Sequence, residues 1–93
     1  MNRTEILNMA NKLINNDRET THGKPVDSFN NIAKLWSAYL DQTLSITDVS
    51  MLMTLMKIAR VKNNNYHSDN FIDICGYSAI AGELSAGERD GDE

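Results

Sequence analysis

At 93 residues, the chain is expected to form one small domain, near the lower limit of size at which a self-sufficient core can be buried. Its apolar content of 41% is ordinary for a folded protein, and its net charge of −4 argues against a duplex-DNA binder, because such proteins usually carry a basic patch. The single cysteine, Cys75, excludes an internal disulfide and a multi-cysteine zinc site. No apolar run reaches the length of a membrane span, so we expect a cytoplasmic protein without a membrane partner.

A first helix is expected over residues 5–16, with Thr4 as its N-cap. Its apolar side chains recur at helical spacing and form one stripe: Ile6, Leu7, Ala10, Leu13 and Ile14. The polar segment that follows, residues 16–27, is long for a connection without regular structure, and such segments are often functional. Within it, Arg18 and His22 either close over an anionic ligand or only decorate a turn.

Two further helices are expected over residues 29–40, capped by Asp27 or Ser28, and over residues 48–61, capped by Thr47. The buried face of the former would consist of Phe29, Ile32, Ala33, Trp36 and Leu40, with Tyr39 beside it. The latter carries one apolar stripe of Val49, Leu52, Met53, Met56 and Ala59 and another of Met51, Leu55 and Ile58. A helix that is apolar on nearly all sides is usually buried on nearly all sides, so we expect it to be central, a subunit interface, or both.

Ser68 opens the fourth expected helix, over residues 69–84. Three small residues follow one another there at three-residue spacing, Gly76, Ala79 and Gly82, and would let another helix approach closely. Residues 86–93 form an acidic tail that we expect to be disordered. No strand-like alternation is present, so the predicted fold class is all-α: a single four-helix domain over residues 1–85, a helical bundle that self-associates.

Ionisable side chains gather around the connection between the last two helices. Lys57 and Arg60 lie three residues apart near the end of one helix, and Asp69 and Asp73 lie four apart at the start of the next. Residues at these spacings share a helix face, so an antiparallel hairpin would bring both pairs together. The result would be a salt-bridged clasp or a polar site that holds a phosphate on the cations or Mg²⁺ on the carboxylates.

Three neighbours complete the set of candidate ligand-binding residues. His67 would contact a ligand or a neighbouring carboxylate, Asn70 would hold polar groups, and Tyr77 could stack on a nucleobase. No serine or cysteine nucleophile is placed by spacing for a catalytic triad, and we name no catalytic residue. The usual cage of four carboxylates around a catalytic metal is also missing, since the preceding helix offers only Asp48, at its far end.

Nearly the whole chain resembles a family of short phage and prophage proteins known only as a domain of unknown function. The segments that carry the resemblance are DRETTHGKPVDSFNNIAKLWSAYL, DVSMLMTLMKIAR and HSDNFIDICGYSAIAGEL. The positions that match the family pattern are Asp17, Arg18, Gly23, Phe29, Trp36, Lys57, Arg60, His67, Asp69, Asp73, Gly76 and Tyr77. The resemblance implies a phage-encoded protein that acts in the cytoplasm of the host cell, but it implies no activity.

A more distant likeness is to the all-α nucleotide pyrophosphatases of the MazG type, helical oligomers whose acidic pairs hold Mg²⁺ against nucleotide phosphates. The segment DNFID looks like their last metal-binding helix. Their preceding Glu-x-x-Glu pair has no counterpart in MLMTLMKIAR. The resemblance therefore implies a nucleotide pocket whose hydrolytic centre is reduced or lost.

We accordingly expect a small helical homo-oligomer that binds a nucleotide or similar anionic small molecule, for nucleotide housekeeping or for sequestering a host defence signal. The alternative is an interaction module that binds a host or phage protein through its apolar third helix or its acidic surface, in which case the charged residues only clasp the hairpin. A Mg²⁺-dependent nucleoside triphosphate pyrophosphatase is a weaker alternative, and whether the protein is an enzyme stays open, with the missing acidic pair favouring a non-enzyme.

Overall fold

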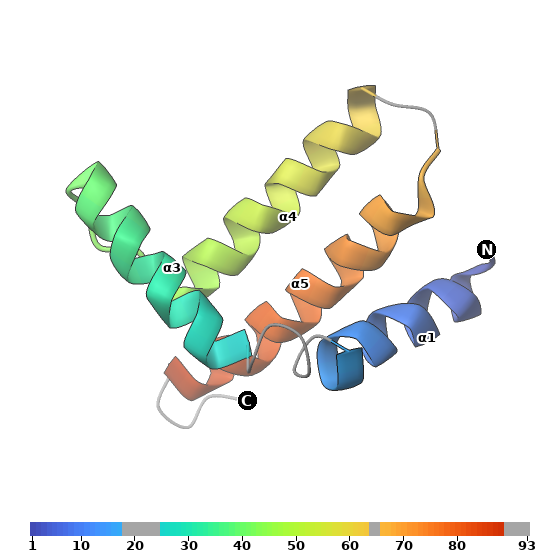
Figure 1. Ribbon diagram of the computed structural model, residues 1–93, viewed down its shortest axis with the longest axis horizontal. Helices are drawn as coiled ribbons and strands as arrows, with labels where there is room; N and C mark the ends of the chain where they lie inside the picture. Colours follow the sequence, from blue (N-terminus) through green and yellow to red (C-terminus); the bar gives the residue numbers. More distant parts are fainter. Residues whose placement is uncertain (18–24, 64–65, 89–93) are drawn as a thin grey trace.

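A computed structural model describes residues 1–17, 25–63 and 66–88 of the chain (Figure 1). These residues form four α-helices, α1 (Arg3–Lys12), α3 (Pro25–Leu40), α4 (Ile46–Asn63) and α5 (Ser68–Glu88), and a π-helical segment, η1 (Leu13–Asp17), that continues α1. No strand occurs among them. The prediction of an all-α, four-helix domain is confirmed.

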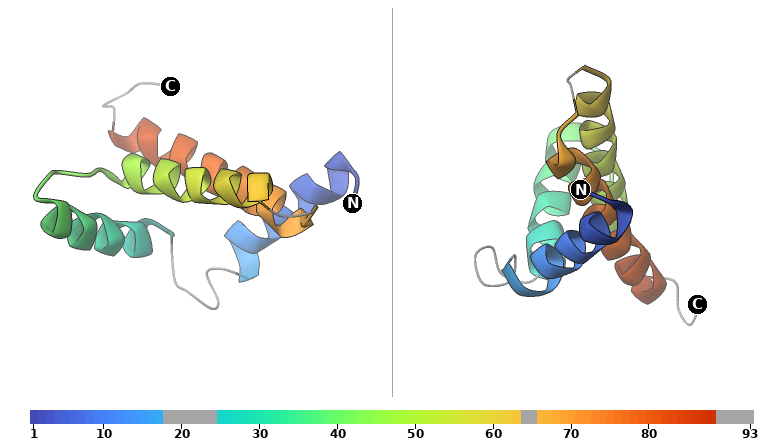
Figure 2. Two further views of the ribbon diagram at one scale, coloured as in Figure 1. Left: turned by 90° about the horizontal axis from the view of Figure 1, so that it is seen from above. Right: turned by 90° about the vertical axis from the view of Figure 1, so that its right-hand side faces the viewer.

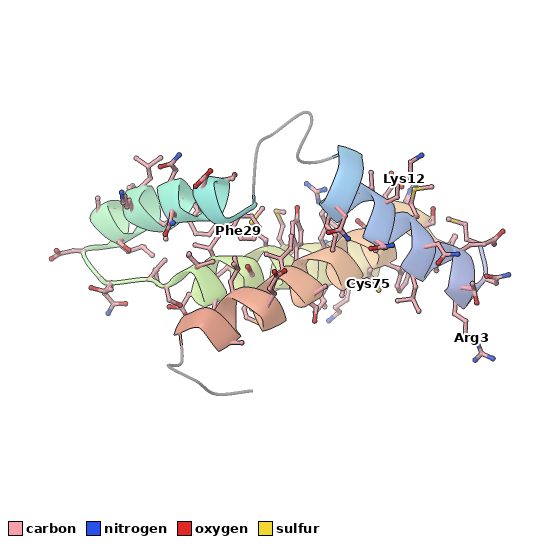
Figure 3. All side chains as sticks on the ribbon, turned by 90° about the horizontal axis from the view of Figure 1, so that it is seen from below. Arg3, Lys12, Phe29 and Cys75 are labelled. Atoms are coloured by element: carbon pink, nitrogen blue, oxygen red, sulfur yellow. The ribbon has the colours of Figure 1, made fainter. Side chains whose placement is uncertain are left out.

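Helices α4 and α5 form a long hairpin and lie side by side (Figure 1). Helix α1 packs against α5, and α3 packs against α4. Both α1 and α3 lie on the same side of the α4–α5 pair, at its opposite ends (Figures 2 and 3). The molecule therefore has two layers, and the side of the α4–α5 pair that faces away from α1 and α3 is not covered by another described helix.

Helices α1 and α4 start earlier than predicted because other residues form their caps, whereas α5 begins at Ser68 as expected. In α1 the N-cap is Asn2, not Thr4: its side chain accepts from the Glu5 N–H and the Glu5 carboxylate accepts from the Asn2 N–H, both at 2.8 Å. At α4 a similar reciprocal pair forms between Ser45 and Asp48, with distances of 2.9 and 3.0 Å, so the cap lies two residues before the predicted one. Thr47, predicted as the cap, lies inside the helix.

Two predicted boundaries were wrong by more than a residue or two. Helix α3 begins at Pro25, four residues early, since proline is well suited to the first helical position and Asp27 stands in the first turn. Helix α5 continues to Glu88, so residues 86–88 of the predicted disordered tail are helical. Residues 89–93, and the segment 18–24 that contains Arg18 and His22, lie outside the described residues.

The core joins α3 to the hairpin. Phe29 and Val49 are fully buried at its centre, and Ala33 and Ile80 complete it. Figure 3 shows Phe29 between α3 and the α4–α5 pair. Burial of a side chain of this size stabilises the fold by about 1.5–3 kcal/mol. The partly buried side chains that pack around this centre come from η1, α3, α4 and α5: Ile14, Ile32, Ile46, Met53, Tyr77 and Leu84.

The second half of α3 departs from its predicted burial. Trp36 is 36% exposed and Leu40 is 52% exposed, although both were predicted to face the core, and Tyr39 is 88% exposed. The helix diverges from α4 beyond Ala33, so no described helix covers these side chains (Figure 1). The apolar spacing correctly identified the apolar face of α3. It did not predict that the neighbouring helix covers only the first half of that face.

The two glycines of α5 have different surroundings, which corrects the predicted row of small residues. Gly76 is buried, and a Cβ atom built on it would lie 3.0 Å from Cγ2 of Ile14, so a close approach of η1 requires glycine here. A Cβ atom built on Gly82 would meet nothing within 4 Å, and Ala79 is exposed. Close packing therefore explains Gly76 alone.

Helix α4 is not enclosed by the other described helices, so it is not a central helix of the single chain, and the alternative expectation of a subunit interface stays a prediction. Only Val49 and Ser50 are buried in it, while Met51, Leu52, Leu55, Met56 and Ile58 are 40–58% exposed. None of the described helices is both long enough and apolar enough to span a membrane.

Candidate functional site

A recess of about 520 Å³ opens where the end of α4, the start of α5 and η1 meet. We call it the hairpin recess. Most of the candidate residues that the sequence singled out contribute to it, and two apolar side chains complete its wall. The lining residues are Leu13, Lys57, Arg60, His67, Asp69, Asn70, Ile72 and Asp73. A space of this size is in the range of small-molecule sites.

The α4–α5 hairpin brings the predicted cationic and acidic pairs together. Nζ of Lys57 lies 2.8 Å from Oδ2 of Asp73, and the two side chains are 12% and 32% exposed. This ion pair joins the two helices and neutralises two of the charges at the recess. The predicted clasp therefore forms, but it uses only one residue of each pair.

The other two charges of the hairpin recess have no such partner among the described residues. Arg60 stands in the last turn of α4 and Asp69 in the first turn of α5, and both are exposed. Each is at the helix end that its charge stabilises, the cation at the carbonyl end and the carboxylate at the N–H end. Neither forms an ion pair within the described parts of the chain, so the guanidinium is left to interact with solvent or with a ligand.

Asn70 is the most unusual residue of the recess. The residue is only 6% exposed, and its backbone N–H donates to the carbonyl oxygen of His67 at 3.2 Å. Its side-chain amide, however, makes no hydrogen bond within the described residues. An unpaired buried polar group costs about 1–3 kcal/mol, and such groups in native proteins usually have a bound partner or a role. Asn70 is also one of the residues that line the recess.

His67 precedes α5 and lines the recess as an exposed residue. Tyr77, by contrast, is not among the lining residues; it packs against Phe29, with ring centroids 6.4 Å apart, beside the core. The arrangement thus brings together Lys57, Arg60, His67, Asn70 and the two aspartates, but not Tyr77. Arg18 and His22 lie outside the described residues.

Sequence reasoning missed two apolar lining residues and one aromatic pair. Leu13 was assigned to the apolar stripe of the first helix, and it reaches the recess because η1 packs against α5. Ile72 lines the recess although only 4% of the residue is exposed. The rings of Tyr66 and Phe71 stack with their centroids 5.7 Å apart, and the two residues remain 61% and 37% exposed. This contact holds the residues just before α5 against the first turn of that helix. The two aromatic residues are five apart and only one of them lies in the helix, so helical periodicity could not predict that they meet.

The donor set bears on the predicted magnesium site. Asp69 and Asp73 both line the recess, but one oxygen of Asp73 is held by Lys57. In the described parts of the chain no group of three or more histidine, cysteine or acidic side chains is placed to hold a metal ion. Mg²⁺ commonly binds through one or two carboxylates together with substrate phosphates and water. The two aspartates therefore fit Mg²⁺ only as part of a metal–phosphate complex.

Comparisons with known proteins agree with the first of the two resemblances. A family model described as a domain of unknown function (DUF6378) matches residues 5–85. The Gene 55 protein of Mycobacterium phage D29 is 48% identical over 73 residues, which cover 78% of this chain and 48% of that protein. The Gene 55 protein of Mycobacterium phage L5 is 36% identical over 85 residues, which cover 89% of this chain and 54% of that protein.

The chain thus spans about half the length of the curated relatives it matches. No solved structure matches it. The predicted kinship with phage proteins of unknown function is confirmed. The likeness to MazG-type pyrophosphatases stays a prediction.

Proposed function

Because this chain belongs to the DUF6378 family, whose function is unknown, we propose a function from its own recess: it binds a phosphate-bearing nucleotide between α4 and α5. The observation that carries this proposal is the side chain of Asn70, buried and without a hydrogen-bond partner among the described residues, at the wall of a recess that also presents Arg60. A protein that only needed to clasp its hairpin would gain stability from an apolar residue at that position.

The charges of the recess favour a nucleotide over a bare anion. The Lys57 ammonium is balanced by Asp73, which leaves Arg60 as the group that can hold a phosphate in a bidentate fork. Asp69 in the same recess would repel an isolated phosphate but accepts hydrogen bonds from hydroxyl or amino groups. A ligand with phosphate at one end and hydrogen-bond donors at the other matches this arrangement, and a nucleotide is such a ligand.

The apolar wall supports the same assignment. Leu13 and Ile72 line the recess between the polar residues, so part of a ligand can be packed against carbon atoms. A sugar or base has faces that suit such a wall, whereas inorganic phosphate does not. Tyr77 has no part in the proposal, because it does not line the recess.

We place binding ahead of hydrolysis. The residues that would meet a metal are Asp69 and Asp73, and the second acidic pair of two-metal pyrophosphatases has no counterpart among the recess residues. Mg²⁺ would enter together with the nucleotide phosphates. Binding without turnover suits sequestration of a nucleotide signal of the host, whereas nucleotide housekeeping would require a partner enzyme.

Titration calorimetry of the full chain tests the proposal against nucleoside mono-, di- and triphosphates, cyclic nucleotides and inorganic phosphate, each with and without Mg²⁺. We expect at least one nucleotide to bind more tightly than about 1 mM, or about −4 kcal/mol, and more tightly than inorganic phosphate. Arg60→Gln should weaken that binding at least about tenfold, which is about 1.4 kcal/mol.

Lys34→Gln is the matched control, since it removes one positive charge from an exposed position on α3, away from the recess. It should leave the affinity unchanged. Equal losses in the two variants would mean that only net charge matters. If no nucleotide binds more tightly than about 1 mM, the recess is a structural clasp and the interaction-module alternative gains support.

A further inference from the structure

The outward side of α4 is an apolar face with no described helix against it. Val49, Met53 and Lys57 point inward at one side of the helix, where they are buried or partly buried. The opposite side presents Met51, Leu52, Leu55, Met56, Ile58 and Ala59, all exposed. We call these six residues the α4 outer face. Soluble monomers rarely expose an apolar patch that runs along a whole helix, and such a patch usually marks an interaction site.

The spacing within this face is that of a helix-pairing seam. Asp48, Leu55 and Lys62 follow one another at intervals of seven, and all three are exposed. Met51 and Leu52 occupy the intermediate positions on one side of Leu55, and Ile58 and Ala59, each seven residues later, occupy them on the other. A repeat of this kind keeps one line of side chains facing a partner helix. At a rise of about 1.5 Å per residue, the seam from Asp48 to Lys62 is about 21 Å long.

The two ends of the seam carry opposite charges, and this identifies the partner. We propose that the α4 outer face pairs with the same face of a second copy of this chain, with the two α4 helices antiparallel and Leu55 at the two-fold axis. Asp48 of each copy then meets Lys62 of the other, because the two are equally distant from Leu55 in sequence. The same face serves both copies, as a two-fold interface requires.

The orientation follows from the same charges. A parallel pairing would place Asp48 beside Asp48 and Lys62 beside Lys62, and like charges in contact are destabilising. In the antiparallel pairing Met51 of one copy packs against Ala59 of the other, a large residue against a small one, which lets the helices interdigitate. The pairing is therefore self-complementary in both charge and size.

This interface is separate from the hairpin recess. Lys57 and Arg60 lie on other sides of α4, one facing α5 and one at the rim of the recess. Pairing along the α4 outer face would leave the recess open in each copy. The self-association and the proposed nucleotide binding can consequently fail independently of each other.

Sedimentation velocity over a wide range of protein concentration tests the pairing. We expect the full chain to form a dimer in a concentration-dependent manner, and Leu55→Glu to be monomeric with unchanged helical circular dichroism, because Leu55 is already 58% exposed in one copy. Leu7→Glu is the matched control: Leu7 is 59% exposed on α1, and that variant should dimerise as the unchanged chain does. A full chain that stays monomeric up to about millimolar concentration, or equal behaviour of the two variants, would overturn the proposal.

Cysteine cross-linking tests the orientation, in a Cys75→Ala background that removes the native thiol. Under mild oxidation, a mixture of the Met51→Cys and Ala59→Cys proteins should form a mixed disulfide dimer, and neither protein should do so alone. A disulfide dimer from the Met51→Cys protein alone would show a parallel pairing and contradict the antiparallel one. A dimer in sedimentation with no cross-link in any mixture would place the interface on another face and would also overturn it.

Discussion

At the scale of single residues, the hairpin recess combines a satisfied pair with an unsatisfied amide. Lys57 and Asp73 neutralise each other at 2.8 Å, while the Asn70 side chain is buried without a hydrogen bond among the described residues. The first arrangement stabilises the hairpin, whereas a buried amide that lacks any partner would oppose folding unless a ligand binds. Stability and ligand binding should therefore respond in opposite directions to a change at Asn70.

Replacement of Asn70 by leucine tests this opposition. The two side chains are similar in size, so Asn70→Leu should raise the free energy of unfolding by about 1 kcal/mol or more, because the unpaired amide is removed from a buried position. Nucleotide affinity should fall below detection in the same variant. Thermal unfolding and calorimetry on one preparation measure both quantities.

Asn8→Leu makes the same chemical change at an exposed position of α1 and should alter stability little and binding not at all. An Asn70→Leu protein that melts below the unchanged chain would show that the amide is held by partners in the folded protein. That result would remove the main support for a ligand in the recess.

At the scale of the elements, the two glycines of α5 respond to different neighbours. Glycine in a helix interior costs about 1 kcal/mol relative to alanine. At Gly82 nothing lies within 4 Å of the added Cβ, so Gly82→Ala should raise the free energy of unfolding by up to about that amount. At Gly76 the added Cβ would lie 3.0 Å from Cγ2 of Ile14. In Gly76→Ala this steric overlap should outweigh the gain in helix propensity, and the free energy of unfolding should fall.

Urea denaturation of the two variants compares them directly. Equal stabilisation by both substitutions would mean that η1 can move away from α5 without cost. It would also mean that the contact which carries Leu13 to the recess is loose.

The presence and order of the helices were largely predictable from the sequence, but their end residues and the helices that pack over them were not. The stripe in α3 correctly identified Phe29 and Ala33 as buried, because a 3.6-residue period reports which face of a helix is apolar. The same stripe wrongly placed Trp36 in the core, since a period carries no information on where the neighbouring helix ends. The caps at Asn2 and Ser45 were missed because several adjacent polar residues can serve, and the backbone geometry selects one.

At the scale of the whole molecule, the candidate site was predictable where it rests on hairpin geometry. The approach of Lys57 to Asp73 follows from two helices joined by a short connection, and the sequence pattern indicated it. The contribution of Leu13 to the recess depends on η1 packing against α5, a contact between distant segments that no local pattern reports. The all-round apolar α4 was a correct signal of an unusual helix, but in one copy of the chain half of it is exposed.

The architecture separates two roles along one helix. The inward and end-facing residues of α4 line the recess with α5, and its outer face is the surface that we propose for association. A small domain with a limited core gains stability from such an association, and the gain depends on protein concentration. Nucleotide binding, in contrast, should not depend on protein concentration, because the described residues that line the recess all belong to one chain.

The location of bound nucleotide in the chain tests the account most directly. Backbone amide NMR spectra of the labelled protein, recorded as the tightest-binding nucleotide is added, report every residue at once. We expect the largest shift changes over residues 57–60 and 67–73, with little change over the second half of α3. Changes confined to other segments, or no change at millimolar nucleotide, would contradict the claim that the recess between α4 and α5 is a ligand site.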